Sequence, residues 1–474
     1  MEGKAKAHFK GSRDKWKNKA KEKSLLTKKV QKRVVELTES RDHWRQKYFL
    51  LKSQSLLSVK TYDKVAFHTY DSGIIWLSVW MQIVGKCSFR SCRHMVIGLG
   101  LYLGVKTRVP SASSIRMWVC KYGHYRYHQL KDTNSEWAII VDESVNIGQE
   151  RLLLILGVNL GNEQSKEWEF NRPLSSADVE VLGVEIATSW TSKAISERID
   201  RLRESYKIAY AVSDEGNNIQ GAWKLQNMLT FNDCTHTWAK ALENLYKDDT
   251  NFIDFLRSVS ALRKRWILSK SSHLLPPAIR VKSRFHQIFE WVNWSESIQE
   301  VWTKLSTEQQ QELAFIQVHQ PLLRALNTIQ KLVKDLNNIL KTKGLSQATI
   351  EQSLTLLKAD LPDLPKVYQF KKMAEQYLSQ HQHTINDKQS FLCCSDIIES
   401  TFGSYKQTIA KNNSNITELV LSIASLGKKF TPQQIKTAMQ EVKVKDVAKW
   451  KQENTTQSLT KIKRDFFNKK GTKK

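Results

Sequence analysis

The sequence predicts an α/β core with a mixed sheet, interrupted by a large all-α insertion and preceded by a long helix and a second helical unit. Apolar, β-branched runs bounded by turn residues occur between residues 136 and 213, which is typical of buried strands. Residues 248–390 show helical spacing instead, and residues 25–57 contain neither Pro nor Gly. The chain has 474 residues, of which 41% are hydrophobic, so it is long enough for two to four domains of about 100–200 residues and is not wholly disordered.

The charge balance favours a polyanionic partner. There are 74 Lys and Arg against 47 Asp and Glu, a formal net charge of +27. Residues 1–60 contribute +12 of this excess and residues 441–474 contribute +7. Such basic arms attract nucleic acid in a salt-sensitive, sequence-independent way, although solubilising tails would have the same composition.

The longest apolar runs, residues 74–84 and 95–105, are shorter than the ~20 residues that cross a bilayer. We therefore expect no membrane association. The basic N-terminus lacks the apolar segment of a secretory signal, so we expect a cytoplasmic protein with reduced cysteines. The six cysteines lack paired CxxC spacing, which argues for buried thiols and against a structural zinc site.

Two helical units precede the core. Residues 1–60 form a basic arm and an amphipathic helix, whose apolar seam suits either a second copy or packing onto its own domain. Residues 61–130 read as a helix-turn-helix-like DNA-binding domain, because a Ser-capped helix begins near 111–115 after a turn. The inward positions of this helix are predicted to be apolar, and three outward positions are predicted to contact DNA: Arg116, Lys121 and Tyr122. An ordinary helical hairpin is the alternative.

The first part of the core, residues 131–247, carries strands at 136–142, 150–160, 179–186 and 207–213, with a helix at 192–205 between the last two. This order is that of a ribonuclease H-like domain. Asp142 ends the first strand and Asp214 follows the fourth. Two acids at neighbouring strand ends repel each other unless a cation lies between them, and carboxylates suit Mg²⁺. We therefore interpret Asp142 and Asp214 as metal ligands.

At this point the chain resembles the DDE transposases of bacterial insertion sequences. The segment 233–238 (DCTHTW) is similar to the Asp/Cys-x-x-His motif of the hAT and Mutator-like members, and a long helical insertion follows it, as in those families. The resemblance implies that His236 and Trp238 contact a phosphate or a base of DNA, although a core Trp and a structural His are the common alternatives.

The segment 395–406 adds a third acid. It reads as a helix in which Glu399 is followed seven residues later by Lys406, two turns further on the same face. This spacing is similar to the end of the Tyr-Arg-Glu-Lys signature of one transposase branch, where the Glu binds metal and the Lys contacts DNA. The Tyr and Arg of that signature are replaced by Leu392 and Ser395. Glu399 is thus the predicted third ligand, and Asp396 is its rival.

The remaining boundaries follow from these motifs. Residues 248–390 form the all-α insertion, 391–430 the last helices of the catalytic core, and 431–474 a basic C-terminal tail. Basic and aromatic residues interleave around 263–294 of the insertion, which suits backbone contacts and base stacking but equally a helical core.

The resemblance implies a DNA transposase that binds the terminal inverted repeats of its own mobile element and performs metal-dependent 3′-end cleavage and strand transfer. Two Mg²⁺ ions, with Mn²⁺ as a substitute, would be held by Asp142, Asp214 and Glu399. The partners implied are double-stranded DNA, as transposon end and target, and a second copy of the chain in a synaptic homodimer. Two alternatives remain: a ribonuclease H-like structure-specific endonuclease or resolvase, and a catalytically retired DNA-binding regulator.

Overall fold

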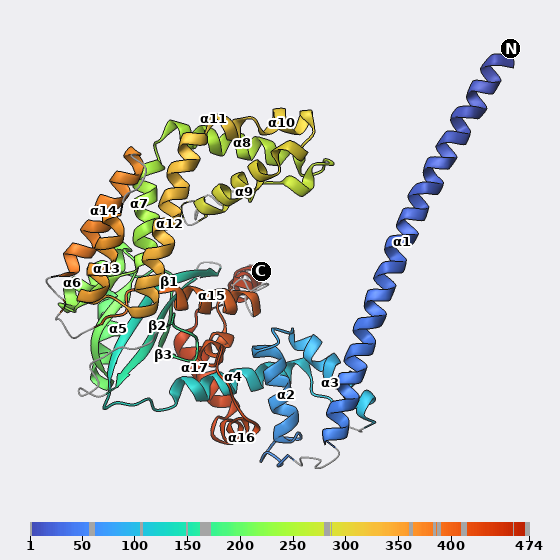
Figure 1. Ribbon diagram of the computed structural model, residues 1–474. Coiled ribbons are helices and arrows are strands. Elements are labelled where there is room, and N and C mark those ends of the chain that lie inside the picture. Colours follow the sequence, from blue (N-terminus) through green and yellow to red (C-terminus); the bar gives the residue numbers. More distant parts are fainter. Residues whose placement is uncertain are drawn as a thin grey trace. The chain divides into compact units, whose positions relative to one another are not determined.

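The computed structural model describes residues 2–55, 62–104, 108–147, 150–161, 172–278, 285, 287–359, 364–382, 385, 390–408, 415–457 and 459–469. The chain divides into two compact units, Met1–Asp63 and Lys64–Lys474. It is a mixed α/β protein in which helices predominate around one five-stranded sheet (Figure 1).

The first unit contains one helix, α1 (Glu2–Ser55), which includes most of the helix predicted over residues 25–57; residues 56 and 57 lie outside the described residues. Its apolar side chains are uncovered in the structure: Leu26, Val30, Leu37 and Trp44 are all more than half exposed. The helix therefore keeps an apolar seam on an otherwise strongly charged surface.

The sheet of the second unit contains β1 (Glu136–Ile147), β2 (Glu150–Gly161), β3 (Val179–Ala187), β4 (Lys207–Ser213) and β5 (Thr230–Asn232). Its strand order is β3-β2-β1-β4-β5. β1 pairs with β2 and β2 with β3 in antiparallel fashion, whereas β4 lies parallel to both β1 and β5. The four predicted strands are present, but β1 continues five residues beyond its predicted end at Asp142, because residues 143–147 also pair with β2. β5 is an addition that the sequence pattern did not reveal.

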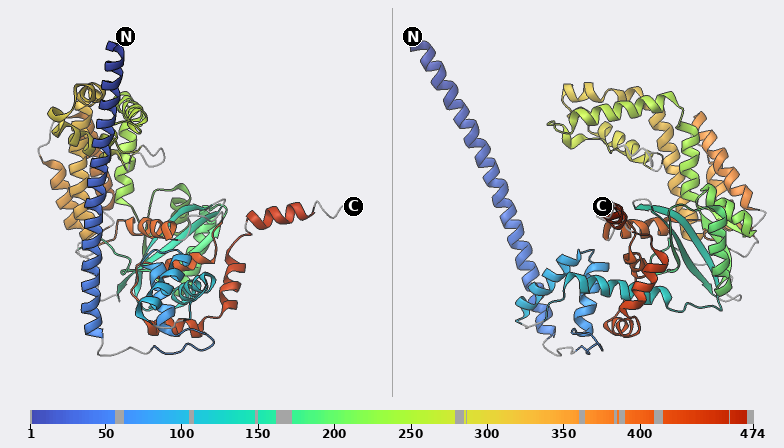
Figure 2. Two further views of the ribbon diagram at one scale, coloured as in Figure 1. Left: turned by 90° about the vertical axis from the view of Figure 1, so that its right-hand side faces the viewer. Right: turned by 180° about the vertical axis from the view of Figure 1, so that it is seen from behind.

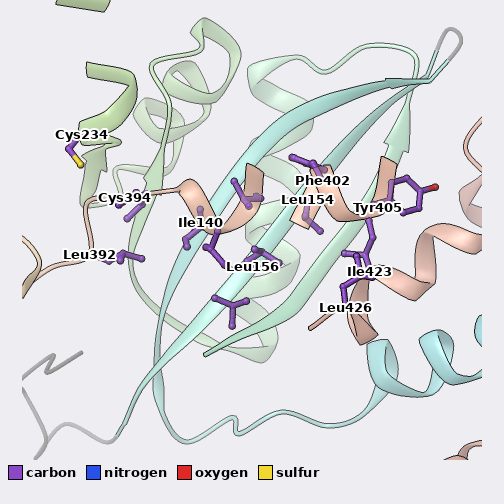
Figure 3. Packing of buried hydrophobic residues seen from close by; sticks show 14 of the residues in the cluster. Ile140, Leu154, Leu156, Cys234, Leu392, Cys394, Phe402, Tyr405, Ile423 and Leu426 are labelled. Carbon is purple, nitrogen blue, oxygen red and sulfur yellow. The ribbon is translucent and has the colours of Figure 1, made fainter. Parts of the chain in front are cut away.

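Side-chain alternation along β1 separates the two faces of the sheet. Trp137, Ile139 and Val141 pack with α5 (Ser192–Ser205) and α6 (Asn217–Gln226) on one face. Ile140 belongs to the larger cluster on the other face, which α15 (Asp396–Thr408) covers (Figure 3). Because successive residues of a strand point to opposite faces, Asp142 lies on the face of Ile140 and α15.

The segment before the sheet forms α2 (Ser72–Ile83), α3 (Phe89–Leu103) and α4 (Ala112–His128), each opened by an Asp or Ser N-cap. Elements from the end of the chain surround α4: η4 (Glu418–Ser425), α16 (Pro432–Glu441) and α17 (Val444–Asn454). η4 approaches α4 so closely that a Cβ on Gly123 of α4 would lie 2.5 Å from the backbone of Leu421 in η4. The stretch predicted as a basic tail therefore begins with two helices that pack around the α2–α4 unit, and a third helix, α18 (Leu459–Lys469), follows them.

Helices fill the region between β5 and α15, as predicted. They are α7 (Cys234–Tyr246), α8 (Thr250–Trp266), η1 (Ser272–Leu274), α9 (Ile288–Glu300), η3 (Trp302–Lys304), α10 (Thr307–Leu313), α11 (Phe315–Val318), α12 (Gln320–Lys343), α13 (Gln347–Lys358) and α14 (Pro365–Gln382). α12 packs against α7, α9, α13 and α14, and α7 and α12 lead from the sheet into the helical region (Figure 2). Trp266 and Trp291 are buried, which favours the core interpretation of these two aromatic side chains over base stacking.

Within the part of the chain that the structure describes, we find no helix with both the length and the apolar character needed to cross a membrane.

Candidate functional site

The register of the parallel strands brings Asp142 beside Asp214. Val141 of β1 lies opposite Ser213, the last residue of β4, so Asp142 is the next residue of β1 and Asp214 is the first residue after β4. Asp142 lies on the face of Ile140. Asp214 turns the chain toward α6, where its Oδ1 accepts a hydrogen bond of 3.0 Å from the backbone N–H of Gly216. The two carboxylates predicted from sequence therefore lie at neighbouring positions on the sheet.

Electrostatic coupling links this pair to the third predicted acid. Burial and the charges of Asp214 and Glu399 together raise the pKa of Asp142 to about 7, although the charge of His236 acts in the opposite direction. A pKa raised by two neighbouring carboxylates indicates negative potential that the protein does not fully neutralise. This is the environment that a bound cation would stabilise.

Glu399 reaches this position because α15 crosses the sheet surface. Ile398, Phe402 and Tyr405 are buried, and Figure 3 shows Phe402 near Leu154 over the strands. Glu399 precedes Phe402 by almost one turn and keeps 53% of its side chain exposed. The apolar stripe of α15 thus orients the helix and leaves Glu399 at its edge, where solvent and a substrate have access.

His236 connects Glu399 to a buried aspartate. Its Nε2 lies 3.2 Å from Glu399 Oε1, and its Nδ1 lies 3.5 Å from Asp233 Oδ1. Burial lowers the pKa of His236, but the hydrogen bonds and charges of Asp233 and Glu399 outweigh burial and raise it to about 11. The imidazole is therefore a cation held between two carboxylates.

Asp233 is fully buried and organises both segments that approach the acids. As the N-cap of α7, its Oδ1 accepts the backbone N–H of His236 at 2.8 Å. Its Oδ2 accepts the backbone N–H of Ser395 at 2.5 Å and also the Ser395 hydroxyl. Burial raises the pKa of Asp233, yet the hydrogen bonds and charge from His236 and Ser395 lower it to about 2. One buried carboxylate thus fixes the start of α7 to the segment that enters α15.

Asp396, the rival third acid, has other partners. It accepts a hydrogen bond of 3.1 Å from Thr235 Oγ1 and forms an ion pair with Lys341 of α12. Asp396 is not among the charges that raise the pKa of Asp142, whereas Glu399 is. The geometry therefore favours Glu399 beside the aspartate pair.

A second arrangement of possible metal ligands lies next to the acids. Asp233, Cys394 and Asp396 each bring one ligand atom within 4.8 Å of the others, a spacing that could hold a metal ion. Among the described residues this is the one group that meets that spacing, so Asp142, Asp214 and Glu399 are more widely separated. A nearby thiol, burial and other charges raise the pKa of Cys394 well above its usual value, and Lys341 already places a positive charge at Asp396. These features suit a hydrogen-bonded cluster more than a resident cation.

Two residues with predicted DNA contacts have different surroundings. Trp238 is 2% exposed, donates its indole N–H to Asn337 Oδ1 at 3.0 Å and packs on Tyr377. The predicted stacking of Trp238 on a base is therefore wrong for this conformation, since α12 and α14 cover the ring. Lys406, by contrast, is exposed on α15 beyond Glu399, where a DNA contact stays a prediction.

The predicted outward face of α4 is also wrong. Lys121 and Tyr122 are buried, and Lys121 donates a hydrogen bond of 2.8 Å to the backbone carbonyl of Met439 in α16. Arg116 forms an ion pair of 2.6 Å with the buried Glu418, which also binds Lys451. The elements from the end of the chain occupy the surface that the sequence pattern assigned to DNA.

Sequence reasoning named Asp233 and Ser395 only as motif positions and assigned them no role in the site, and it did not single out Lys341. The signal for Asp233 was available, because an Asp three residues before a helical N–H is the spacing of an N-cap. No local pattern points to Ser395 or Lys341, because their partners are distant in the chain.

No protein-family model matches this chain, and a search of curated proteins finds no match to it.

Proposed function

We propose that the chain is a DDE-type DNA transposase that cleaves the 3′ ends of its own mobile element and transfers them to target DNA. The observation that carries this proposal is the convergence of Asp142, Asp214 and Glu399, which come from two strands and one distant helix. Polynucleotidyl transfer needs such a group of acids where a phosphodiester can approach it.

The topology supports a ribonuclease H-like core. Three antiparallel strands are followed by two parallel ones in the order β3-β2-β1-β4-β5, with helices between β3 and β4 and between β4 and β5. The helical region between β5 and α15 corresponds to an insertion before the helix that supplies the third acid. This arrangement supports catalysis at the point where Asp142 of β1 lies beside the end of β4.

The acids are of the chemical type that divalent cations bind. Asp142 and Asp214 would hold Mg²⁺, or Mn²⁺ in its place, and Glu399 would complete the ligand set, because carboxylate oxygens are the ligands that these ions prefer. When bound, such ions stabilise the charge on the attacking and leaving oxygens of a phosphodiester. The chain's own contribution is positioning: Asp233 orients His236, and His236 holds the carboxylate of Glu399 toward Asp142.

Charge supports DNA as the substrate. The net charge of +27 and the basic α1 favour phosphate contacts, and Lys406 is an exposed cation on the helix that carries Glu399. Synapsis of two element ends makes a homodimer the expected active form.

The test is incubation of the full chain with Mg²⁺ and a labelled DNA fragment carrying the ends that flank its own gene. We expect nicking at the ends and joined products, which Asp142→Asn and Glu399→Gln abolish while DNA binding persists. Asp335→Asn, a change of an acid on α12, serves as a charge-matched control. Cutting without joining would identify a structure-specific endonuclease, and binding without cutting would identify a regulator; either result overturns the proposal.

A further inference from the structure

A cavity of about 500 Å³ lies where the end of α2, residues 426–430 and α15 meet. Its floor is apolar, because Ile83, Leu426 and Phe430 line it and are each less than 9% exposed. The volume falls within the ~300–1,000 Å³ range of small-ligand sites. The cavity lies apart from the three acids but borders the helix that carries one of them.

One wall of this cavity is an accessible aromatic ring. Trp80 is 40% exposed, and its ring lies 6.4 Å from that of Trp76. The indole N–H of Trp76 donates a hydrogen bond of 2.9 Å to the backbone carbonyl of Phe430. Trp76 is therefore held in place by Phe430, which also lines the cavity, and it lies beside the partly exposed Trp80 ring.

The rim of the cavity is basic. Lys86, Lys428 and Lys429 line it, and no Asp or Glu is among its lining residues. Lys86 donates to the neutral amide of Gln407 at 3.0 Å, so its charge is not neutralised there. Lys428 forms an ion pair of 2.9 Å with Glu180, whereas Lys429 is exposed. Two lysines can thus offer positive charge beside an aromatic wall and an apolar floor.

We propose that this cavity binds one unpaired nucleotide of the DNA on which the protein acts. An aromatic face stacks on any base, and lysines beside it bind the flanking phosphates. Proteins that bind single-stranded nucleic acid combine these two features. Trp80 and Val84 line the same cavity as Lys86 and Lys429, so a base stacked on Trp80 leaves its flanking phosphates to these lysines. This inference rests on the proposed function, since it names a feature of the DNA substrate.

The helix α15 contributes both to this cavity and to the group of acids. Ser404 lines the cavity and lies five residues after Glu399 on α15. Gln407, the partner of Lys86, is on the same helix. Five residues correspond to about 140° around a helix, so a nucleotide held here contacts a different face of α15 from the one that carries Glu399 and Lys406.

The test uses the full chain without divalent ions and a duplex with one unpaired 2-aminopurine, whose fluorescence is quenched when it stacks on an aromatic ring. We expect quenching on binding and about tenfold tighter binding of this duplex than of a fully paired one. Trp80→Ala removes the quenching and the preference, Trp80→Phe retains part of both, and Lys86→Gln with Lys429→Gln weakens the preference. Tyr368→Ala, a change of an exposed aromatic residue on α14, serves as the matched control. Thermal melting of each variant verifies that it is folded.

The possible results separate this inference from the proposed function. If Trp80→Ala binds and quenches the unpaired duplex as the wild type does, while the wild type still cuts DNA, only the nucleotide site is overturned. If free adenosine monophosphate quenches the tryptophan fluorescence of the wild type but not that of Trp80→Ala, and the wild type shows no preference for the unpaired duplex, the site belongs to a soluble nucleotide and the inference is also overturned. Failure to bind any duplex would overturn the proposed function instead.

Discussion

The imidazole of His236 bridges two carboxylates, with Nε2 3.2 Å from Glu399 and Nδ1 3.5 Å from the buried Asp233. The arrangement resembles an outer-shell support, in which a residue that binds no substrate orients one that does. If Glu399 acts as the third catalytic acid, its orientation depends on His236 and therefore on Asp233.

The first prediction concerns this support. His236→Ala should lower kcat for DNA cleavage by about 10–100-fold, because loss of an outer-shell partner typically has this effect. DNA affinity should change little, since the imidazole is engaged with protein groups. Cleavage kinetics and binding measured on the same preparation check both parts. An unchanged kcat would show that Glu399 needs no such support.

The second prediction is a loss of stability on removal of the Asp233 carboxylate. Asp233→Ala deprives α7 of its N-cap and leaves the buried N–H of Ser395 without its acceptor, so the free energy of unfolding should fall by about 2–4 kcal/mol. Asp71→Ala, which removes the N-cap of α2, should cost only about 1 kcal/mol. Urea denaturation of the two variants compares them, and equal losses would contradict the joining role of Asp233.

The third prediction separates the two candidate acids. Glu399→Gln should reduce strand cleavage by about 10³-fold or more, because it removes charge from the site that contains Asp142. Asp396→Asn should retain cleavage within about tenfold, since Asp396 pairs with Lys341 and Thr235. A labelled-end cleavage assay distinguishes them. The reverse order of effects would make Asp396 the third acid.

The fourth prediction is a pH dependence of stability that arises from His381. Burial lowers the pKa of this imidazole to about 4, and its ring lies against Phe231 and Tyr377. Because the folded pKa is below the unfolded value of 6.5, the unfolded state binds the proton more tightly. The resulting loss of stability begins as pH falls below about 6.5 and is complete below about 4, reaching about 2–3 kcal/mol.

His381→Gln should remove this component, so its free energy of unfolding should decline less steeply than that of the wild type between pH 6.5 and 4. Denaturation across this pH range measures the difference. Parallel curves for the two proteins would show that His381 does not contribute.

The fifth prediction concerns Arg116. Since this side chain pairs with the buried Glu418, Arg116→Gln should lower the free energy of unfolding by about 1–3 kcal/mol and leave DNA affinity at fixed salt unchanged. Lys406→Gln, by comparison, should weaken DNA binding and leave stability unchanged, because Lys406 is exposed. Calorimetry and fluorescence anisotropy on both variants decide between a structural and a DNA-contacting role.

Local patterns in the sequence were sufficient for the existence of four strands, for the helical character of residues 234–382 and for the position of Asp214 directly after β4. The predicted end of the first strand at Asp142 was wrong, because β1 continues to Ile147 through its pairing with β2. The spacing of apolar residues differs between buried strands and helices, so it predicts which of the two a segment forms. The last residues of a strand lie at one edge of the sheet. Glu399 was recognised through its spacing to Lys406, and the structure brings it near Asp142.

The tertiary structure alone decided which surfaces are covered and which distant groups meet. Lys121 and Met439 are 318 residues apart, and Asp233 and Ser395 are 162 apart, yet each pair is joined by a hydrogen bond. Periodicity identifies two faces of a helix but does not reveal which later segment covers the polar one, so α4 was predicted to be open where η4 and α16 bury it. Contacts of this kind depend on the path of the whole chain, whereas strand and helix formation depends mainly on neighbours within a few residues.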